Sequence, residues 1–293
     1  MFSYLLYAFL WAFSFLPFWL LYLCSDIGYF FAYHLFRYRR GEVRANLRHA
    51  FPEKGEREIR RVERKFYHHL LDVSVEFYKL WHAPTRVLRA RCVFTNPEVA
   101  TRYLAAGRSV IAVMGHYANW EWLSLYGLHV DFPFVALYKP LHDRVMDRLS
   151  RRLRSRPGTV LVPKNDVARA VLRYRGEGRA FLLALVADQA PKESSLNFWT
   201  TFLNQETSVF KGTERIAVKY DMPVLFLEMR KTRRGHYEAE FHLVSDRPGS
   251  LPPGELTRAH TRVLEAAIRE RPEYWLWSHR RWKYKRPPGA PLH

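Results

Sequence analysis

The segment "SVIAVMGHYANWEWLSLY" (residues 109–126) joins a short apolar run to a glycine and a histidine. The run is almost entirely apolar and only six residues long, which is typical of a strand buried on both faces of a sheet. Gly115 permits a tight turn after the strand, and Asn119 can cap a helix that starts at Trp120. The segment therefore predicts a strand, a turn that carries the histidine, and a helix.

Similar apolar runs recur along the chain, with helical patterns between them. The expected strands cover residues 109–114, 132–138, 159–163, 180–187 and 223–229. The expected helices cover a long amphipathic stretch between residues 52 and 84, and residues 143–153, 166–174, 212–220 and 257–269. Residues 236–244 alternate polar and apolar side chains, as an edge or antiparallel strand does. This order predicts an α/β fold with a mixed, mostly parallel β-sheet flanked by helices.

The chain carries a large excess of positive charge. It has 47 Lys and Arg against 28 Asp and Glu, a formal charge of +19, which favours polyanionic partners such as nucleic acid, anionic lipid or acidic proteins. The only two cysteines are Cys24 and Cys92, so a disulfide framework and a thiolate metal site are both unexpected.

The first 25 residues contain no charged side chain. As one helix they would reach roughly 35 Å, enough to cross a bilayer core of about 30 Å, although Pro17 could kink them. An arginine-rich stretch over residues 37–48 follows, which favours the cytoplasmic side and anionic lipid. We expect residues 1–36 to be a membrane anchor, with a hydrophobic N-terminal membrane helix, and residues 37–293 to be one catalytic domain. The alternative is a hydrophobic hairpin that lies in the membrane interface and never crosses.

His116 lies in the expected turn, and Glu121 lies in the first turn of the helix that follows. Ligands of open α/β sheets bind outside the carboxyl ends of the strands, where this turn is expected. A carboxylate near a helix N-terminus stays ionised and can orient an imidazole. The pair can therefore act as a general base that takes a proton from a substrate hydroxyl. The alternative is a histidine that caps a helix beside an ordinary acidic residue.

Two other histidines are followed by an acid five residues later: His142 by Asp147 and His260 by Glu265. Residues five apart in a continuous helix point about 140° away from each other. This excludes His260 with Glu265, which lie in an expected helix, and His142 lies in a stretch that also looks helical. The pair at 116 and 121 differs because a turn separates its members.

Several segments, in chain order, resemble the late acyltransferases of bacterial lipid A biosynthesis. The matching elements are "GHYANWEW" (115–122), "LYKP" (137–140), "RLRS" (152–155), "ADQ" (187–189), "FLNQETSVFKGTERIA" (202–217) and "YWLWSHRRWK" (274–283). The first is similar to the glutamate version of the histidine-x4-acid motif of glycerolipid acyltransferases. Ordered elements over nearly the whole chain are more specific than the dyad alone.

The resemblance implies an O-acyltransferase that moves a fatty acyl chain from an acyl carrier protein or coenzyme A thioester to a hydroxyl of a lipid A precursor. It implies His116 as the base and Glu121 as its orienting partner, without a metal or an organic cofactor. It further implies an enzyme of the inner, cytoplasmic membrane, with the catalytic domain on the cytoplasmic side and no nucleic-acid partner.

The remaining candidate residues are assigned to substrate binding or pocket support through the same resemblance: Lys139, Arg154, Asp188 and Gln189. Lys139 departs from the family, which commonly has Arg there, and a lysine cannot form a bidentate fork with a phosphate. An aminolipid or lysophospholipid acceptor remains an alternative. A non-enzymatic basic protein of the membrane surface, or one that binds nucleic acid, is the alternative of a different class.

Overall fold

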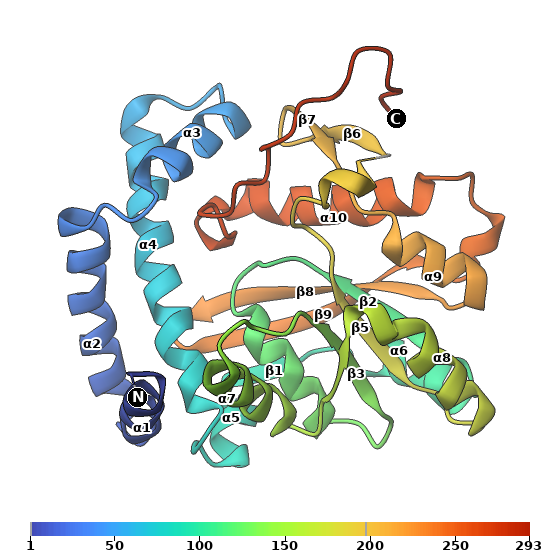
Figure 1. Cartoon of the computed structure of the whole chain (residues 1–293), viewed down its shortest axis with the longest axis horizontal. Helices are drawn as coiled ribbons and strands as arrows, with labels where there is room; N and C mark the ends of the chain where they lie inside the picture. Colours follow the sequence, from blue (N-terminus) through green and yellow to red (C-terminus); the bar gives the residue numbers. More distant parts are fainter. Residues whose placement is uncertain (1, 197) are drawn as a thin grey trace.

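The fold is organised around one large sheet, seen in a computed structural model that describes residues 2–196 and 198–293. Its strands are β1 (Cys92–Phe94), β2 (Val110–Met114), β3 (Phe134–Tyr138), β4 (Val160–Pro163), β5 (Leu182–Val186), β8 (Val224–Arg233) and β9 (His236–Ser245). They lie in the order β1-β9-β8-β2-β5-β3-β4, flanked by helices (Figure 1). All neighbours pair in parallel except β8 and β9, which form an antiparallel hairpin. The predicted α/β fold with a mixed, mostly parallel sheet is confirmed.

All five expected apolar runs form strands, and residues 236–244 form β9, antiparallel to β8 as expected. The central strand β2 is buried along its whole length, which explains why its sequence is apolar on both faces. A separate small hairpin of β6 (Trp199–Phe202) and β7 (Gln205–Ser208) was not among the expected strands. Its strands are only four residues long and carry polar side chains, so no apolar run announces them.

The longest helix is α4 (Glu56–Lys79), inside the expected stretch, and its apolar face packs into the core. The other α-helices that follow α2 are α3 (Arg40–Ala50), α5 (Thr85–Arg91), α6 (Glu98–Ala105), α7 (Arg144–Ser155), α8 (Val167–Gly176), α9 (Gly212–Tyr220) and α10 (Glu255–Glu270). Four of them lie where helices were expected: α7, α8, α9 and α10. Residues 120–128 form a 3₁₀ helix, and the Asn119 side chain caps it by accepting a hydrogen bond from the Trp122 N–H.

The single membrane-crossing helix expected over the first 25 residues is wrong. The stretch forms two helices, α1 (Phe2–Phe13) and α2 (Phe18–Tyr29), separated by a turn that ends at Pro17. Proline lacks the N–H that a continuous helix requires, and its ring clashes with the preceding turn. Each helix has 12 residues and is therefore about 18 Å long. Within the residues described, no helix is both long and apolar enough to cross a bilayer.

The turn between α1 and α2 is held by a residue from the far end of α4. The ammonium group of Lys79 donates hydrogen bonds to the carbonyls of Ser14, at 3.0 Å, and Leu16, at 2.8 Å. The Ser14 hydroxyl lies 2.6 Å from Nδ1 of His82. The chain continues from α2 into a π-helical turn at Phe30–Leu35. Helices α1 and α2 and this turn, which we call the N-terminal helices, all contact α4 (Figure 1).

Candidate active site

The site forms where the neighbouring strands β2 and β5 end. The two strands pair in parallel with Met114 opposite Val186, so the residues two positions further on, His116 and Asp188, also meet. The Asp188 carboxylate accepts hydrogen bonds from the His116 backbone N–H, at 2.8 Å, and from its Nδ1, at 2.6 Å. Asp188 thus fixes both the backbone and the ring of the histidine.

Gly115 is required by close packing at this point. A Cβ atom placed on Gly115 would lie 2.7 and 2.9 Å from the two methyl carbons of Leu264 on α10, and 3.3 Å from Asp188 Oδ2. Such distances are well below van der Waals contact for the methyl groups. The absence of a side chain at residue 115 is therefore what lets the Asp188 carboxylate and α10 approach the backbone before His116.

Asp188 accepts a third hydrogen bond from the C-terminal segment. The indole N–H of Trp275 donates to its Oδ2 at 2.8 Å. Burial alone would raise the pKa of the Asp188 carboxyl, but the imidazole and the three donors outweigh it and lower that pKa to about 2. The carboxylate in turn raises the pKa of His116, against the effect of burial. Asp188 is therefore ionised at neutral pH, and the proton of the neutral imidazole sits on Nδ1.

The other ring nitrogen of His116, Nε2, faces the accessible side of the site. It lies 3.2 Å from the side-chain nitrogen of Gln189, which can donate an amide hydrogen to it. About a fifth of the His116 side chain is exposed, and Gln189 lies at the protein surface. The Trp120 ring packs edge-on against the imidazole, with 5.4 Å between ring centroids. The lone pair of Nε2 is thus directed to where a substrate could replace the glutamine amide.

Glu121 lies one step away and is bound to Arg154 of α7. The guanidinium forms a bidentate pair with the Glu121 carboxylate, with N–O distances of 2.8 and 2.6 Å. The expected hydrogen bond between Glu121 and His116 is absent from the structure within the described residues. The negative charge of Glu121 still contributes to raising the pKa of His116, less than Asp188 does. The carboxylate that contacts the imidazole is therefore Asp188, which the motif spacing could not indicate.

Lys139 follows β3, the strand next to β5, and is exposed. It forms no ion pair with any residue in the described parts of the chain. Because β3 is parallel to β5, Lys139 lies at the same edge of the sheet as Asp188. It therefore places an exposed positive charge at this edge and is separate from the buried His116 and Asp188 pair.

The C-terminal segment fixes the turn that carries His116. The Leu276 N–H donates to the His116 carbonyl at 3.1 Å, and the Ala118 N–H donates to the Tyr274 carbonyl at 3.0 Å. Ala118 has a left-handed conformation with φ of 49°, which is costly for a residue with a side chain. Its carbonyl lies 3.1 Å from Nε2 of the buried His69 on α4. Both the C-terminal segment and α4 therefore hold this turn.

Beneath the turn, Glu76 of α4 is fully buried. Its carboxyl accepts hydrogen bonds from the Asn119 amide at 2.6 Å, the Tyr237 hydroxyl at 2.7 Å and the Tyr22 hydroxyl at 2.9 Å. Burial raises the pKa of Glu76 to about 7. One carboxyl group on α4 thus contacts α2 through Tyr22, β9 through Tyr237, and the capping residue Asn119.

Two other clusters of polar side chains have partners in the structure. His68, Asp72 and Glu76 share a face of α4, but His68 stacks on Tyr29 while Asp72 pairs with Lys231 and with Arg234, so they do not converge on one point. In the C-terminal basic stretch, Nε2 of His279 accepts from the Ala190 N–H, and the buried Arg281 donates to the Ser208 carbonyl. Arg280 and Lys283 remain at the surface.

The fold and site define an α/β protein in which a histidine is hydrogen-bonded to a buried carboxylate at a sheet edge. The chain belongs to the family of bacterial lipid A biosynthesis acyltransferases, which it matches over residues 1–284. The predicted resemblance is confirmed, and so is the prediction that the chain is an acyltransferase; the non-enzymatic alternative is thereby set aside.

Among its relatives is the lipid A biosynthesis lauroyltransferase of Escherichia coli K12, which is 26% identical over 254 residues, 85% of this chain and 80% of the relative. The lipid A biosynthesis palmitoleoyltransferase of the same organism is 25% identical over 253 residues, covering 86% and 80%. A lipid A biosynthesis acyltransferase of Shigella flexneri shows the same identity and coverage.

Proposed function

We propose that the protein transfers a fatty acyl chain from an acyl carrier protein or coenzyme A thioester to a hydroxyl group of a lipid A precursor, with His116 as general base. The observation that carries the proposal is the orientation of the imidazole. Asp188 Oδ1 lies 2.6 Å from His116 Nδ1 and keeps the imidazole proton on that nitrogen. The lone pair of Nε2 therefore points to the accessible side, where it can accept a proton once the Gln189 amide is displaced.

In the proposed reaction the acceptor hydroxyl replaces the Gln189 amide at Nε2 of His116. The hydroxyl oxygen attacks the thioester carbonyl carbon while its proton passes to Nε2. The C–S bond then breaks, and the thiolate leaves with the proton returned by the imidazolium, so that an ester and a thiol are formed. Asp188 stabilises the transient imidazolium. No covalent acyl-enzyme is required, because no Ser or Cys adjoins His116 in the sequence.

The contacts favour different roles for the two acids. Asp188 is the orienting partner of His116, and Glu121 fixes the Arg154 guanidinium at the edge of the site. Gln189 holds the place of the acceptor, and Lys139 supplies a charge for a phosphate group on either substrate. We expect no metal and no organic cofactor to take part.

The N-terminal helices provide the proposed membrane attachment. Its large apolar side chains are mostly exposed, among them Phe2 at 77%, Trp19 at 68% and Phe36 at 72%. Exposed large apolar side chains gathered in one part of a protein mark a membrane or protein interaction site. We therefore propose that residues 1–36 lie in the inner membrane interface and that residues 37–293 form the catalytic domain on its cytoplasmic side. The charge of +19 suits an acidic carrier protein as donor.

The direct test uses purified protein in detergent with an acyl carrier protein or coenzyme A thioester and a lipid A precursor. We expect wild type to form one new ester, and His116→Ala to lose transfer by about 10²-fold or more while its circular dichroism is unchanged. Undiminished transfer by the folded variant would refute His116 as base.

The acceptor is tested separately by mass spectrometry of total lipids from cells with and without the gene. The proposal predicts a lipid A species that lacks one acyl chain. Loss of an acyl chain from an aminolipid or a phospholipid, with lipid A unchanged, would instead assign the alternative acceptors.

A further inference from the structure

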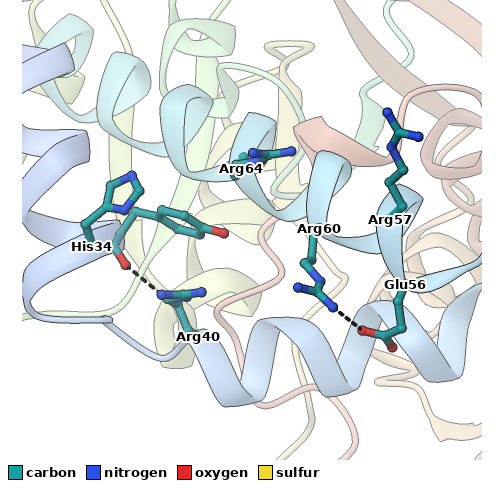
Figure 2. A pocket seen from close by; sticks show the side chains of 7 residues that line it. His34, Arg40, Glu56, Arg57, Arg60 and Arg64 are labelled. Carbon is teal, nitrogen blue, oxygen red and sulfur yellow. Dashed lines mark hydrogen bonds and ion pairs between the residues drawn. The ribbon is translucent and has the colours of Figure 1, made fainter.

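A basic pocket of about 670 Å³ lies on the α3 and α4 side of the molecule, apart from the catalytic residues. The residues that give it its character are His34, Arg40, Glu56, Arg57, Arg60 and Arg64. Figure 2 shows the guanidinium groups of Arg40 and Arg60 in the space between the two helices. His116, Asp188, Glu121 and Arg154 do not line this pocket.

The arrangement follows from helix geometry. Arg57, Arg60 and Arg64 lie three and four residues apart on α4 and therefore share one face. Arg40 enters from α3, where its guanidinium packs over the Tyr33 ring at 4.2 Å and donates to the Tyr33 carbonyl. Cations from two helices thus face one space.

Three of the arginines in the arginine-rich stretch, residues 37–48, form ion pairs with glutamates. Arg44 forms a bidentate pair with the buried Glu63, and Arg48 forms one with Glu56. Arg40 shares Glu63 with Arg44. The charges of Arg44 and Arg48 are therefore largely compensated, whereas that of Arg40 is compensated only in part.

The cations of α4 are less well compensated. Arg60 has only a long contact of 4.0 Å with Glu56, which Arg48 already occupies. Arg57 and Arg64 form no ion pair with any residue among 2–196 and 198–293. Four arginines, the three on α4 and Arg40, and one glutamate, Glu56, line the pocket, so its lining carries an excess of three positive charges (four minus one).

The neighbouring surface identifies the kind of anion. The π-helical turn Phe30–Leu35 contributes Tyr33 and His34 to the pocket, and the same stretch exposes Phe30, Phe31, Leu35 and Phe36. A phosphate between the arginines would therefore lie beside a surface suited to acyl chains. A soluble anion would gain nothing from these apolar side chains, whereas a phospholipid would contact both surfaces.

We propose that this pocket binds the phosphodiester headgroup of an anionic membrane phospholipid, and thereby fixes how deeply and in which orientation the enzyme sits on the bilayer. The inference rests on the proposed membrane attachment of residues 1–36. It assigns to the pocket a lipid that is neither the acyl donor nor the acceptor.

The test is the partitioning of full-length protein between buffer and vesicles of phosphatidylcholine, with or without phosphatidylglycerol. The variant Arg57→Gln/Arg60→Gln/Arg64→Gln removes three exposed charges while keeping good helix formers. We expect its binding to phosphatidylglycerol vesicles to fall by about tenfold to 100-fold, with binding to pure phosphatidylcholine unchanged.

The matched control is Arg169→Gln/Arg173→Gln/Arg175→Gln, the same charge change at three exposed positions of α8, which lies on the opposite side of the molecule from α4 (Figure 1). We expect this control to lose about twofold or less. Equal losses in the two triple variants would overturn the pocket, because they would show a response to net charge alone.

Two further arms separate other ligands from the lipid. Displacement of the protein from phosphatidylglycerol vesicles by soluble glycerol phosphate would overturn the assignment to a membrane lipid. A loss of acidic carrier protein binding in the α4 variant, with vesicle binding intact, would show instead a protein-docking surface. Acyl transfer by wild type in detergent tests the proposed function independently, so its failure and the failure of the pocket are distinguishable.

Discussion

Asp188 Oδ1 lies 2.6 Å from His116 Nδ1, although 72 residues separate the two in the chain. The contact exists because β2 and β5 are parallel neighbours in register, and because each residue follows its strand by two positions. It makes the state of one side chain dependent on the other, since Asp188 raises the pKa of His116 and His116 lowers that of Asp188. This dependence can be measured.

Replacing Asp188 by asparagine should change both the rate and its pH dependence. The base must be neutral, so the rate falls as the pH drops through the pKa of His116. Asp188 raises that pKa. Asp188→Asn should therefore lower it and move the acid limb of the kcat profile to lower pH, while the plateau falls by on the order of 10³-fold.

Glu121→Gln is the control for this profile. The amide oxygen can still accept from Arg154, and Glu121 has no hydrogen bond to His116 to lose. We expect a smaller shift of the acid limb in the same direction, because the Glu121 charge contributes less to the pKa of His116. A larger shift in Glu121→Gln than in Asp188→Asn would reverse the proposed roles.

Glu76 should make stability depend on pH. Its pKa is raised in the folded protein to about 7, from 4.5, so the folded state binds its proton more tightly than the unfolded state. The stabilisation is fully present below pH 4.5 and is lost as the pH rises towards 7. Between pH 4.5 and 7.5 the free energy of unfolding of wild type should fall, relative to Glu76→Gln, by about 3 kcal/mol.

The measurement is urea unfolding in mild detergent at several pH values, followed by tryptophan fluorescence. Glu177→Gln, an exposed change beyond the end of α8, should run parallel to wild type. A constant difference between wild type and Glu76→Gln across this range would show that folding does not raise the pKa of Glu76.

Gly115→Ala should destabilise the protein by about 1–3 kcal/mol, because the new methyl group would collide with Leu264. The expected displacement of the His116 backbone should also reduce kcat. The double variant Gly115→Ala/Leu264→Ala provides the space, so its thermal unfolding and rate should recover relative to the sum of the single changes. Additive effects would mean that the two residues are not in contact.

The exposed apolar side chains of the N-terminal helices should contribute to membrane binding. Phe2→Ser, Phe9→Ser and Trp19→Ser change side chains that are 77%, 61% and 68% exposed. Each should weaken partitioning onto vesicles by about 2 kcal/mol, with little effect on the free energy of unfolding. Leu172→Ser on α8 is the matched control, because Leu172 is 59% exposed and α8 lies on the opposite side of the molecule from α1 and α2 (Figure 1). A loss of the same size in Leu172→Ser would contradict this orientation.

The strands and the long helix could be predicted because their sequence patterns are local. Buried strands such as β2 are apolar throughout, and α4 repeats its apolar residues with the period of a helix. The turn after β2 and its capping Asn119 also follow from neighbouring residues. These features do not depend on the order of the strands in the sheet.

The incorrect or incomplete predictions depend on distant partners. The break between α1 and α2 is stabilised by Lys79, which comes more than sixty residues later. The partner of His116 depends on the strand order, because only the pairing of β2 with β5 brings Asp188 to it. Motif spacing instead suggested Glu121, which is close in sequence but bound to Arg154.

The C-terminal segment, which supplies Trp275 to Asp188 and Leu276 to His116, is synthesised after the strands β2 and β5 that carry these two residues. Helices α1 and α2, which expose many apolar side chains, are synthesised before all of these elements. A nascent chain can therefore settle on its bilayer before it possesses a working base, and prematurely released fragments should be inert. A chain that stops after Glu270 should still sediment with membranes but transfer no acyl groups, and turnover by such a fragment would contradict this order of assembly.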